Sequence, residues 1–222
     1  MAADLAKRRV AILISGRGSN MTALIDAAAA KEYPAEIVLV VSNIAEAAGL
    51  AKAAQAGIAT ATIESKPFGK DREAFERKLH ETLVIHDIEL VCLAGFLRLL
   101  TPWFVRQWEG RMLNIHPALL PAYKGLHTHE RALADGVKIH GATVHFVVPE
   151  MDSGPIVMQG AVAVLDGDTP ETLAARVLGV EHQIYPDALR LVAGGGTRLQ
   201  DGRCETEANG SPDDMLISPA VI

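Results

Sequence analysis

The sequence predicts an α/β protein with a Rossmann-like architecture: a mostly parallel sheet, helices on both faces, and antiparallel strands added in the C-terminal half. In the first half of the chain, short and continuously apolar runs alternate with amphipathic stretches. This alternation is typical of a parallel sheet that helices cover on both faces. In the second half, two longer β-rich segments at 139–148 and 156–165 flank a Pro/Gly loop, so they can pair as antiparallel neighbours.

Composition agrees with one globular domain and excludes several classes of protein. The 222 residues are 49% hydrophobic and 22% charged, and a chain of this length folds without disulfides or metal. The net charge of −6 disfavours a nucleic-acid or membrane-surface binder. The apolar runs are too short for a membrane span or a secretory signal peptide. Cys92 and Cys204 lie far apart without ligand spacing, which favours a reducing, cytoplasmic setting.

The first half alternates strands and helices. Buried strands are predicted at 10–15, 36–42, 59–63 and 90–94. An apolar stripe with helical spacing follows the first strand, formed by Met21, Leu24, Ile25 and Ala28. An alanine-rich helix is predicted at 46–56, where Gly57 is a typical C-terminal stop. A third helix is predicted at 71–85 from apolar residues four apart.

The second half begins with a strand at 112–115 and a short helix at 128–134, before the two β-rich segments. The last helix is predicted to open at Thr169, as N-cap, and Pro170, as first helical residue. It should run to about Tyr185, where Pro186 is expected to break or kink it. The catalytic domain is therefore expected over 1–193, with residues 194–222 as a peripheral tail.

The turn from Gly16 to Asn20 is a candidate phosphate site. It follows the first strand and opens the first helix, where backbone N–H groups and the helix dipole favour an anion. Gly18 lets the backbone approach a ligand, and Ser19 and Asn20 add donors. The pattern is neither a dinucleotide fingerprint nor a P-loop, so it indicates one phosphate group. An ordinary turn with a Ser or Asn cap explains this segment equally well.

Asn114 and His116 are a candidate catalytic pair at a strand end. Pro117 keeps His116 extended, so both side chains should project to one side. There the amide can stabilise an oxyanion and the imidazole can handle a proton. Asp152, in the Pro/Gly loop, would favour a charged imidazole if it approached His116. A satisfied strand end and a turn-forming aspartate are the alternatives.

Other polar residues carry weaker signals. Glu181 shares the apolar stripe of the last helix, so its side chain either packs at the edge of the stripe or faces a polar ligand. We favour the ligand, because a buried unpaired charge is costly. His127 and His129 have no partners at zinc spacing, so we expect no metal. A nucleophile elbow is absent, and mid-strand Cys92 is expected to serve packing.

Taken in order and spacing, these motifs resemble the phosphoribosylglycinamide formyltransferase family, the folate-dependent glycinamide ribonucleotide transformylases of purine synthesis. The resemblance covers roughly residues 9–190. It is carried by LISGRGSN (13–20), LAGFLRLL (93–100), NIHPALLPAYKGLHTHERAL (114–133), GATVHFV (141–147), MDSGPI (151–156) and EHQIYP (181–186).

The resemblance implies the formyltransferase fold, with a nucleotide-binding half at about 1–100 and a folate-binding, catalytic half at about 101–193. It implies transfer of the formyl group of 10-formyltetrahydrofolate to the amine of glycinamide ribonucleotide, a step of IMP biosynthesis. We expect small-molecule substrates only, without nucleic acid, membrane or metal, and a cytoplasmic homodimer. The Leu120–Pro121 bond is expected to be cis, and Ala118 stands where relatives often carry Ser.

The resemblance also implies residue roles. Gly18, Ser19 and Asn20 would hold the ribotide phosphate, and Glu181 the ribose hydroxyls. Asn114, His116 and Asp152 would form the catalytic trio, with amine attack stabilised by Asn114 and His116. The folate pocket would be lined by Arg72, Leu97, Arg98, Leu99, Leu100, Asn114, Val148, Pro149, Glu150, Met151 and Asp152.

Other functions remain open at this point. A formyltetrahydrofolate deformylase shares the trio but is expected to have a further N-terminal regulatory domain and no GSN loop. Methionyl-tRNA formyltransferase is longer and has an RNA-binding domain. A folate or nucleotide binding protein would leave the trio idle.

Overall fold

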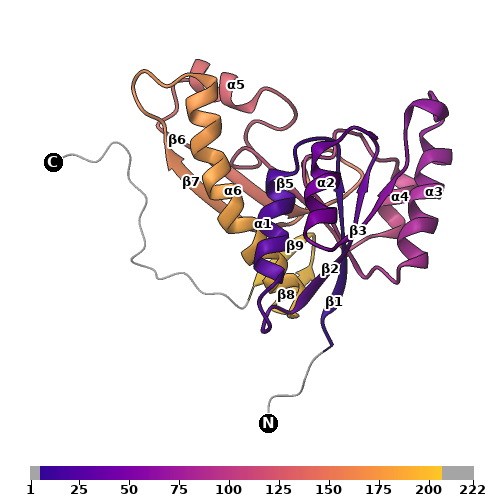
Figure 1. Cartoon of the computed structure of the whole chain (residues 1–222). Helices are drawn as coiled ribbons and strands as arrows, with labels where there is room; N and C mark the ends of the chain where they lie inside the picture. The colour runs from indigo at the N-terminus through magenta and orange to yellow at the C-terminus, as the bar shows by residue number, and fades with distance from the viewer. Residues whose placement is uncertain (1–5, 207–222) are drawn as a thin grey trace, which may run out of the picture.

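In the computed structural model, which describes residues 6–206, seven strands form one sheet in the order β3-β2-β1-β4-β5-β6-β7 (Figure 1). The parallel strands are β1 (Arg8–Ile14), β2 (Ala35–Ser42), β3 (Ala59–Thr62), β4 (Leu90–Leu93) and β5 (Met112–His116). β6 (Ile139–Phe146) and β7 (Ile156–Ala163) are antiparallel additions beside β5. The predicted fold class is therefore confirmed.

Helices cover both faces of this sheet. Alternate residues of each strand enter opposite cores, as the pleat requires. One core packs Val10 and Ile12 against α1 (Ser19–Ala28), α2 (Ala48–Gln55) and α6 (Pro170–Ala193). The other packs Ala11 and Leu13 against α3 (Arg72–Ile85) and α4 (Pro102–Gln107). The remaining elements are the 3-10 helix η1 (Lys66–Phe68) and α5 (Thr128–Ala134); α4 and η1 have no counterpart in the sequence-based assignment.

The predicted end of the last helix is wrong. α6 runs through Pro186 to Ala193, although an interior proline costs about 3 kcal/mol relative to alanine. Tyr185 and Pro186 are both buried, the Tyr185 hydroxyl lies within hydrogen-bond distance of two strand carbonyls, and the Tyr33 hydroxyl donates to the Pro186 carbonyl at 2.6 Å. Tertiary packing therefore outweighs the local preference to stop.

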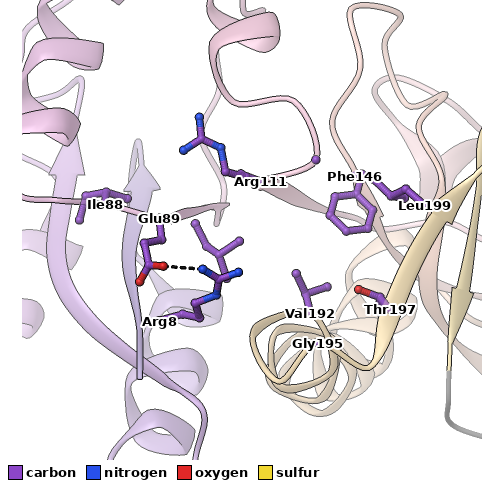
Figure 2. A pocket seen from close by; sticks show the side chains of 11 residues that line it. Arg8, Ile88, Glu89, Arg111, Phe146, Val192, Gly195, Thr197 and Leu199 are labelled. Carbon is purple, nitrogen blue, oxygen red and sulfur yellow. Dashed lines mark hydrogen bonds and ion pairs between the residues drawn. The ribbon is translucent and has the colours of Figure 1, made fainter. Parts of the chain in front are cut away.

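A hairpin follows α6, where only an irregular tail is expected from the sequence. β8 (Thr197–Gln200) pairs with β9 (Arg203–Thr206), and both turn residues, Asp201 and Gly202, have positive φ, as a tight hairpin turn requires. A pocket of about 330 Å³ lies beside this hairpin. Figure 2 shows its lining side chains, which come from the hairpin, the end of α6 and the Arg8–Glu89 ion pair. Residues 207–222 of the predicted tail lie outside the described residues.

No helix among residues 6–206 is long and apolar enough to cross a membrane.

Candidate active site

The loops after β1, β4 and β5 meet at the carboxyl edge of the sheet. β1 lies between β2 and β4, so the chain reverses its direction across the sheet there, which is where open α/β sheets bind ligands. Ser15 ties two of these loops together: its N–H donates to the Gly95 carbonyl at 3.1 Å, and its hydroxyl accepts the Leu97 N–H at 2.9 Å. Asn114 is two strands away from Leu13, hence about 10 Å.

The structure brings His116 and Asp152 together. His116 is 5% exposed, its Nδ1 lies 3.5 Å from Asp152 Oδ2, and its Nε2 lies 2.9 Å from the Tyr123 carbonyl oxygen. Each ring nitrogen therefore faces an acceptor, so an imidazolium would have a partner on both sides. The Gly125 N–H donates to Asp152 Oδ2 at 2.9 Å and fixes the carboxylate.

A fourth residue, His145, completes this cluster, and the sequence-based search missed it. The register of β5 and β6 places it opposite Asn114. Burial lowers the pKa of His145. The neutral ring donates from Nδ1 to the Phe146 carbonyl at 2.9 Å, and its Nε2 accepts from the Asn114 amide at 3.2 Å. The signal was present in the alternation of polar Thr143 and His145 within GATVHFV.

The chain after His116 is held in place from β6 and β7. The Thr143 hydroxyl donates to the Ala118 carbonyl at 2.7 Å and accepts the Leu120 N–H at 3.0 Å. The Gln159 amide donates to the Leu120 carbonyl at 2.9 Å. The Leu120–Pro121 bond is cis, as expected. This network holds the segment although Ala118 contributes no hydroxyl.

The candidate phosphate loop at 16–20 differs from a side-chain-capped turn. Gly18 is the N-cap of α1 with a φ of 69°, and no side chain caps the helix, so the capped-turn explanation is wrong. Gly49 of α2 packs against this loop and was not identified from the sequence. Its N–H donates to the Gly16 carbonyl at 3.0 Å, and a Cβ at Gly49 would lie 2.5 Å from Ile14 Cδ1. Close packing of glycines thus shapes the loop.

Asn20 and Glu181 form a second polar pair beside that loop. The Asn20 amide donates to Glu181 Oε2 at 2.6 Å. Glu181 is 7% exposed, and burial raises the pKa of its carboxyl group. Asn20 Oδ1 is buried and has no hydrogen-bond partner among the described residues. Both groups could accept hydrogen bonds from a ligand's hydroxyls, so Glu181 faces a polar environment rather than the edge of the apolar stripe.

Most of the predicted folate residues lie on two loops, whereas Arg72 begins α3 and Asn114 lies in β5. Leu97 and Leu99 are 79% and 63% exposed. Arg72 Nη1 donates to the Leu99 carbonyl at 3.4 Å. In the loop after β6, Val148 is half-buried, whereas its next three residues, Pro149, Glu150 and Met151, are exposed. The structure gives their positions, and their contact with folate stays a prediction.

The other candidates take no part in this cluster. His127 is the exposed N-cap of α5, with its Nδ1 3.3 Å from Glu130, and residues 6–206 contain no group of His, Cys, Asp or Glu side chains that could hold a metal ion. Cys92 is buried, and burial raises the pKa of its thiol to about 12. It therefore serves packing, as predicted, since a reactive cysteine needs a thiolate.

The sequence matches the family model described as formyl transferase over residues 8–189. The chain belongs to the formyl transferase family. Among curated relatives of this formyl transferase, the phosphoribosylglycinamide formyltransferase of Escherichia coli is 45% identical over 86% of this chain and 90% of its own length. The trifunctional purine biosynthetic protein adenosine-3 of Bos taurus is 52% identical. The chain spans about a fifth or less of the length of the first curated relatives it matches, which are trifunctional proteins.

Solved structures agree with this membership. Glycinamide ribonucleotide transformylase 1 from Symbiobacterium toebii superposes with a TM-score of 0.87 at 42% identity, over 90% of this chain and 94% of that one. A formyltetrahydrofolate deformylase from Pseudomonas syringae has a TM-score of 0.84 at 26% identity, and the match covers 66% of that chain. The formyl transferase fold is thus shared by both, and the site residues must discriminate between their activities.

Proposed function

We propose that this formyl transferase transfers the formyl group of 10-formyltetrahydrofolate to the amine of glycinamide ribonucleotide, a step of purine biosynthesis. The observation that carries the proposal is the coexistence of two polar sites at one sheet edge. The Asn114–His116–Asp152 cluster suits acyl transfer, and the uncapped α1 N-terminus with Asn20 and Glu181 suits a ribose monophosphate. A near full-length relative from Escherichia coli is named for this activity.

The geometry suggests how the residues divide the work. The substrate amine attacks the formyl carbon, and a new C–N bond forms as the bond to the folate nitrogen breaks. The Asn114 amide, oriented by His145, and the His116 imidazolium donate to the developing oxyanion. The Asp152 carboxylate, 3.5 Å from His116 Nδ1, is placed to orient the ring. One proton leaves the amine and one is gained by the folate nitrogen, so the step balances without a cofactor beyond the donor.

The faces of the donor's ring system are assigned to Leu97 and Leu99, whose side chains are exposed. Burying them against a ring would remove apolar surface from water, which is favourable by about 25 cal/mol per Å². Arg72, Arg98 and the loop 148–152 complete the proposed folate site. Gly18, Ser19 and Asn20 bind the ribotide phosphate in this proposal.

Release of the deformylated folate tests the proposal. The purified chain is mixed with donor and ribotide, with the ribotide omitted in one arm and His116→Ala used in another. Release that needs both ribotide and His116 supports the transferase. Ribotide-independent release that still needs His116 supports the deformylase instead, and binding without release supports a non-catalytic binding protein.

We further propose that the protein acts in the cytoplasm as a homodimer, without nucleic acid or membrane partners. The net charge of −6 supports the absence of polyanionic partners. Sedimentation velocity should give a mass twice the 23.7 kDa of the chain; a species at 23.7 kDa over the whole concentration range would contradict the dimer.

A further inference from the structure

One face of helix α3 holds the chain segment that carries Leu97 and Leu99. The contacting residues are spaced i, i+3 and i+4, so they lie side by side on the helix. Arg72 donates to the Leu99 carbonyl at 3.4 Å, and the Phe75 ring packs under the Arg98 guanidinium at 4.9 Å. The third residue, Glu76, binds the end of the same segment.

Glu76 is unusual because its carboxylate is almost fully buried. It is 1% exposed, and both of its oxygens are used by Thr101. The Thr101 N–H donates to Oε1 at 2.8 Å, and the Thr101 hydroxyl donates to Oε2. A buried carboxylate is costly unless such donors satisfy it. Arg72 and Arg98 add favourable charge, while burial raises the carboxyl pKa.

Thr101 connects this anchor to the next element. It is the N-cap of α4, and its hydroxyl oxygen accepts the Phe104 N–H. At the other end of the segment, the Leu97 N–H is bound by Ser15. The backbone of 97–101 is therefore held at both ends. Arg98 and Thr101 turn toward α3, and Leu97 and Leu99 are left exposed at the site.

We propose that Glu76 is a positioning residue for the folate donor: through Thr101 it holds residues 97–101 so that Leu97 and Leu99 meet the donor's ring. The inference deepens the proposed function and rests on it. Glu76 itself touches neither substrate, so its removal should weaken donor binding and leave ribotide binding intact.

Steady-state kinetics separate this role from a merely structural one. Glu76→Ala should raise the KM for 10-formyltetrahydrofolate about tenfold, which corresponds to about 1.4 kcal/mol, with the ribotide KM unchanged. Glu76→Gln keeps the length and an acceptor for the Thr101 N–H, so it should restore most of the loss. A structural role alone would lower the fraction of active enzyme, and therefore kcat, without moving the donor KM.

Two further variants keep the test decisive. Thr101→Val removes the hydroxyl that donates to Glu76 at almost constant volume, so it carries the test if Glu76→Ala fails to fold. Combined with Glu76→Ala, it should add little to the rise in the donor KM, since both variants break the same contact; the lost α4 cap should lower stability only. Glu73→Ala, on the exposed side of α3, is the matched control and should leave both KM values unchanged.

Calorimetric titration of the wild-type and variant proteins with tetrahydrofolate distinguishes failure of the Glu76 inference from failure of the proposed function. A wild type that transfers formyl and binds folate, with variants of unchanged donor KM, would overturn the role of Glu76 alone. A wild type that neither binds folate nor transfers formyl would overturn the proposed function and this inference together.

Discussion

The groups beside His116 determine which atoms its two ring nitrogens can contact. Asp152 faces one ring nitrogen and the Tyr123 carbonyl faces the other, so the ring has a partner on each side when it is charged. His145, in contrast, is buried and neutral, and it fixes the amide of Asn114. Two imidazoles on adjacent strands therefore take different tasks because their environments differ.

Asp152→Asn tests the electrostatic part of this arrangement. The amide keeps the shape and an acceptor for the Gly125 N–H, but it removes the charge beside His116. We expect kcat/KM to fall by about 10²–10⁴, the usual contribution of a positioned acid–base group, with ribotide affinity unchanged. Initial rates and ribotide binding by calorimetry check it, and near wild-type turnover would rule out the assigned role.

Glu181→Gln tests whether the buried charge of Glu181 favours ligand binding at the cost of protein stability at the candidate ribotide site. Burial raises the pKa of Glu181 above its ordinary 4.5. The free-energy cost of its buried charge is therefore absent below the pKa that Glu181 has in the unfolded chain, and it grows as the pH rises through the pKa that Glu181 has in the folded protein. The variant should raise Tm at pH 8 by about 2–4 °C, the effect of about 1 kcal/mol in a domain of this size.

The same variant should bind the ribotide more weakly, because the amide is a poorer acceptor for hydroxyls than the carboxylate. Thermal melts at pH 8 and pH 5 give the control, since the gain in Tm should shrink at the lower pH. An equal gain at both values would show that charge burial is not its cause.

Helix α6 illustrates how far element boundaries follow from the sequence. Its start is predicted correctly because Thr169 and Pro170 carry a local capping signal. Its end is not predicted correctly, because the burial of Tyr185 and Pro186 is a tertiary effect. The Asp201–Gly202 dipeptide is typical of a tight hairpin turn, although the sequence-based assignment has no hairpin there. His145 alternates with Thr143 in the sequence, but its place opposite Asn114 follows only from the β5–β6 register.

Thr169→Ala tests the start of α6. The Thr169 hydroxyl accepts the Thr172 N–H at 3.3 Å, and the Thr172 hydroxyl accepts the Thr169 N–H at 2.9 Å. Loss of this capping box should cost about 1 kcal/mol. Chemical denaturation measures it, and Thr169→Ser, which keeps the hydroxyl, should recover the wild-type midpoint. Equal losses in both variants would contradict capping as the source.

At the scale of the whole molecule, α6 packs against α1 from the first half of the chain and against β6 and β7 from the second. The Tyr185 hydroxyl lies within hydrogen-bond distance of the Leu93 carbonyl of β4, at 3.1 Å, and of the Leu113 carbonyl of β5, at 3.2 Å. The hydroxyl therefore links α6 to two strands. One is β4, which leads into the candidate folate segment, and the other is β5, in which Leu113 precedes Asn114. The fold as a whole was predictable from hydrophobic patterning, whereas this link required three-dimensional packing.

Tyr185→Phe removes that link and leaves the ring. We expect a loss of about 0.5–1.5 kcal/mol, the usual net contribution of a hydrogen bond, because the hydroxyl is fully buried. Equilibrium unfolding in urea measures the change, and an unaltered slope would show that the unfolded state is unchanged. An unchanged midpoint would contradict the assigned role of this hydroxyl.

Identification of the product that receives the formyl group tests the central claim most directly. The protein is incubated with 10-formyltetrahydrofolate carrying an isotopic label in the formyl carbon, with and without glycinamide ribonucleotide, and the products are separated and weighed by mass spectrometry. The account predicts that the label appears on the ribotide amine, in equal amount to the folate released, and only when the ribotide is present. Label recovered as free formate at the same rate with or without ribotide would contradict it.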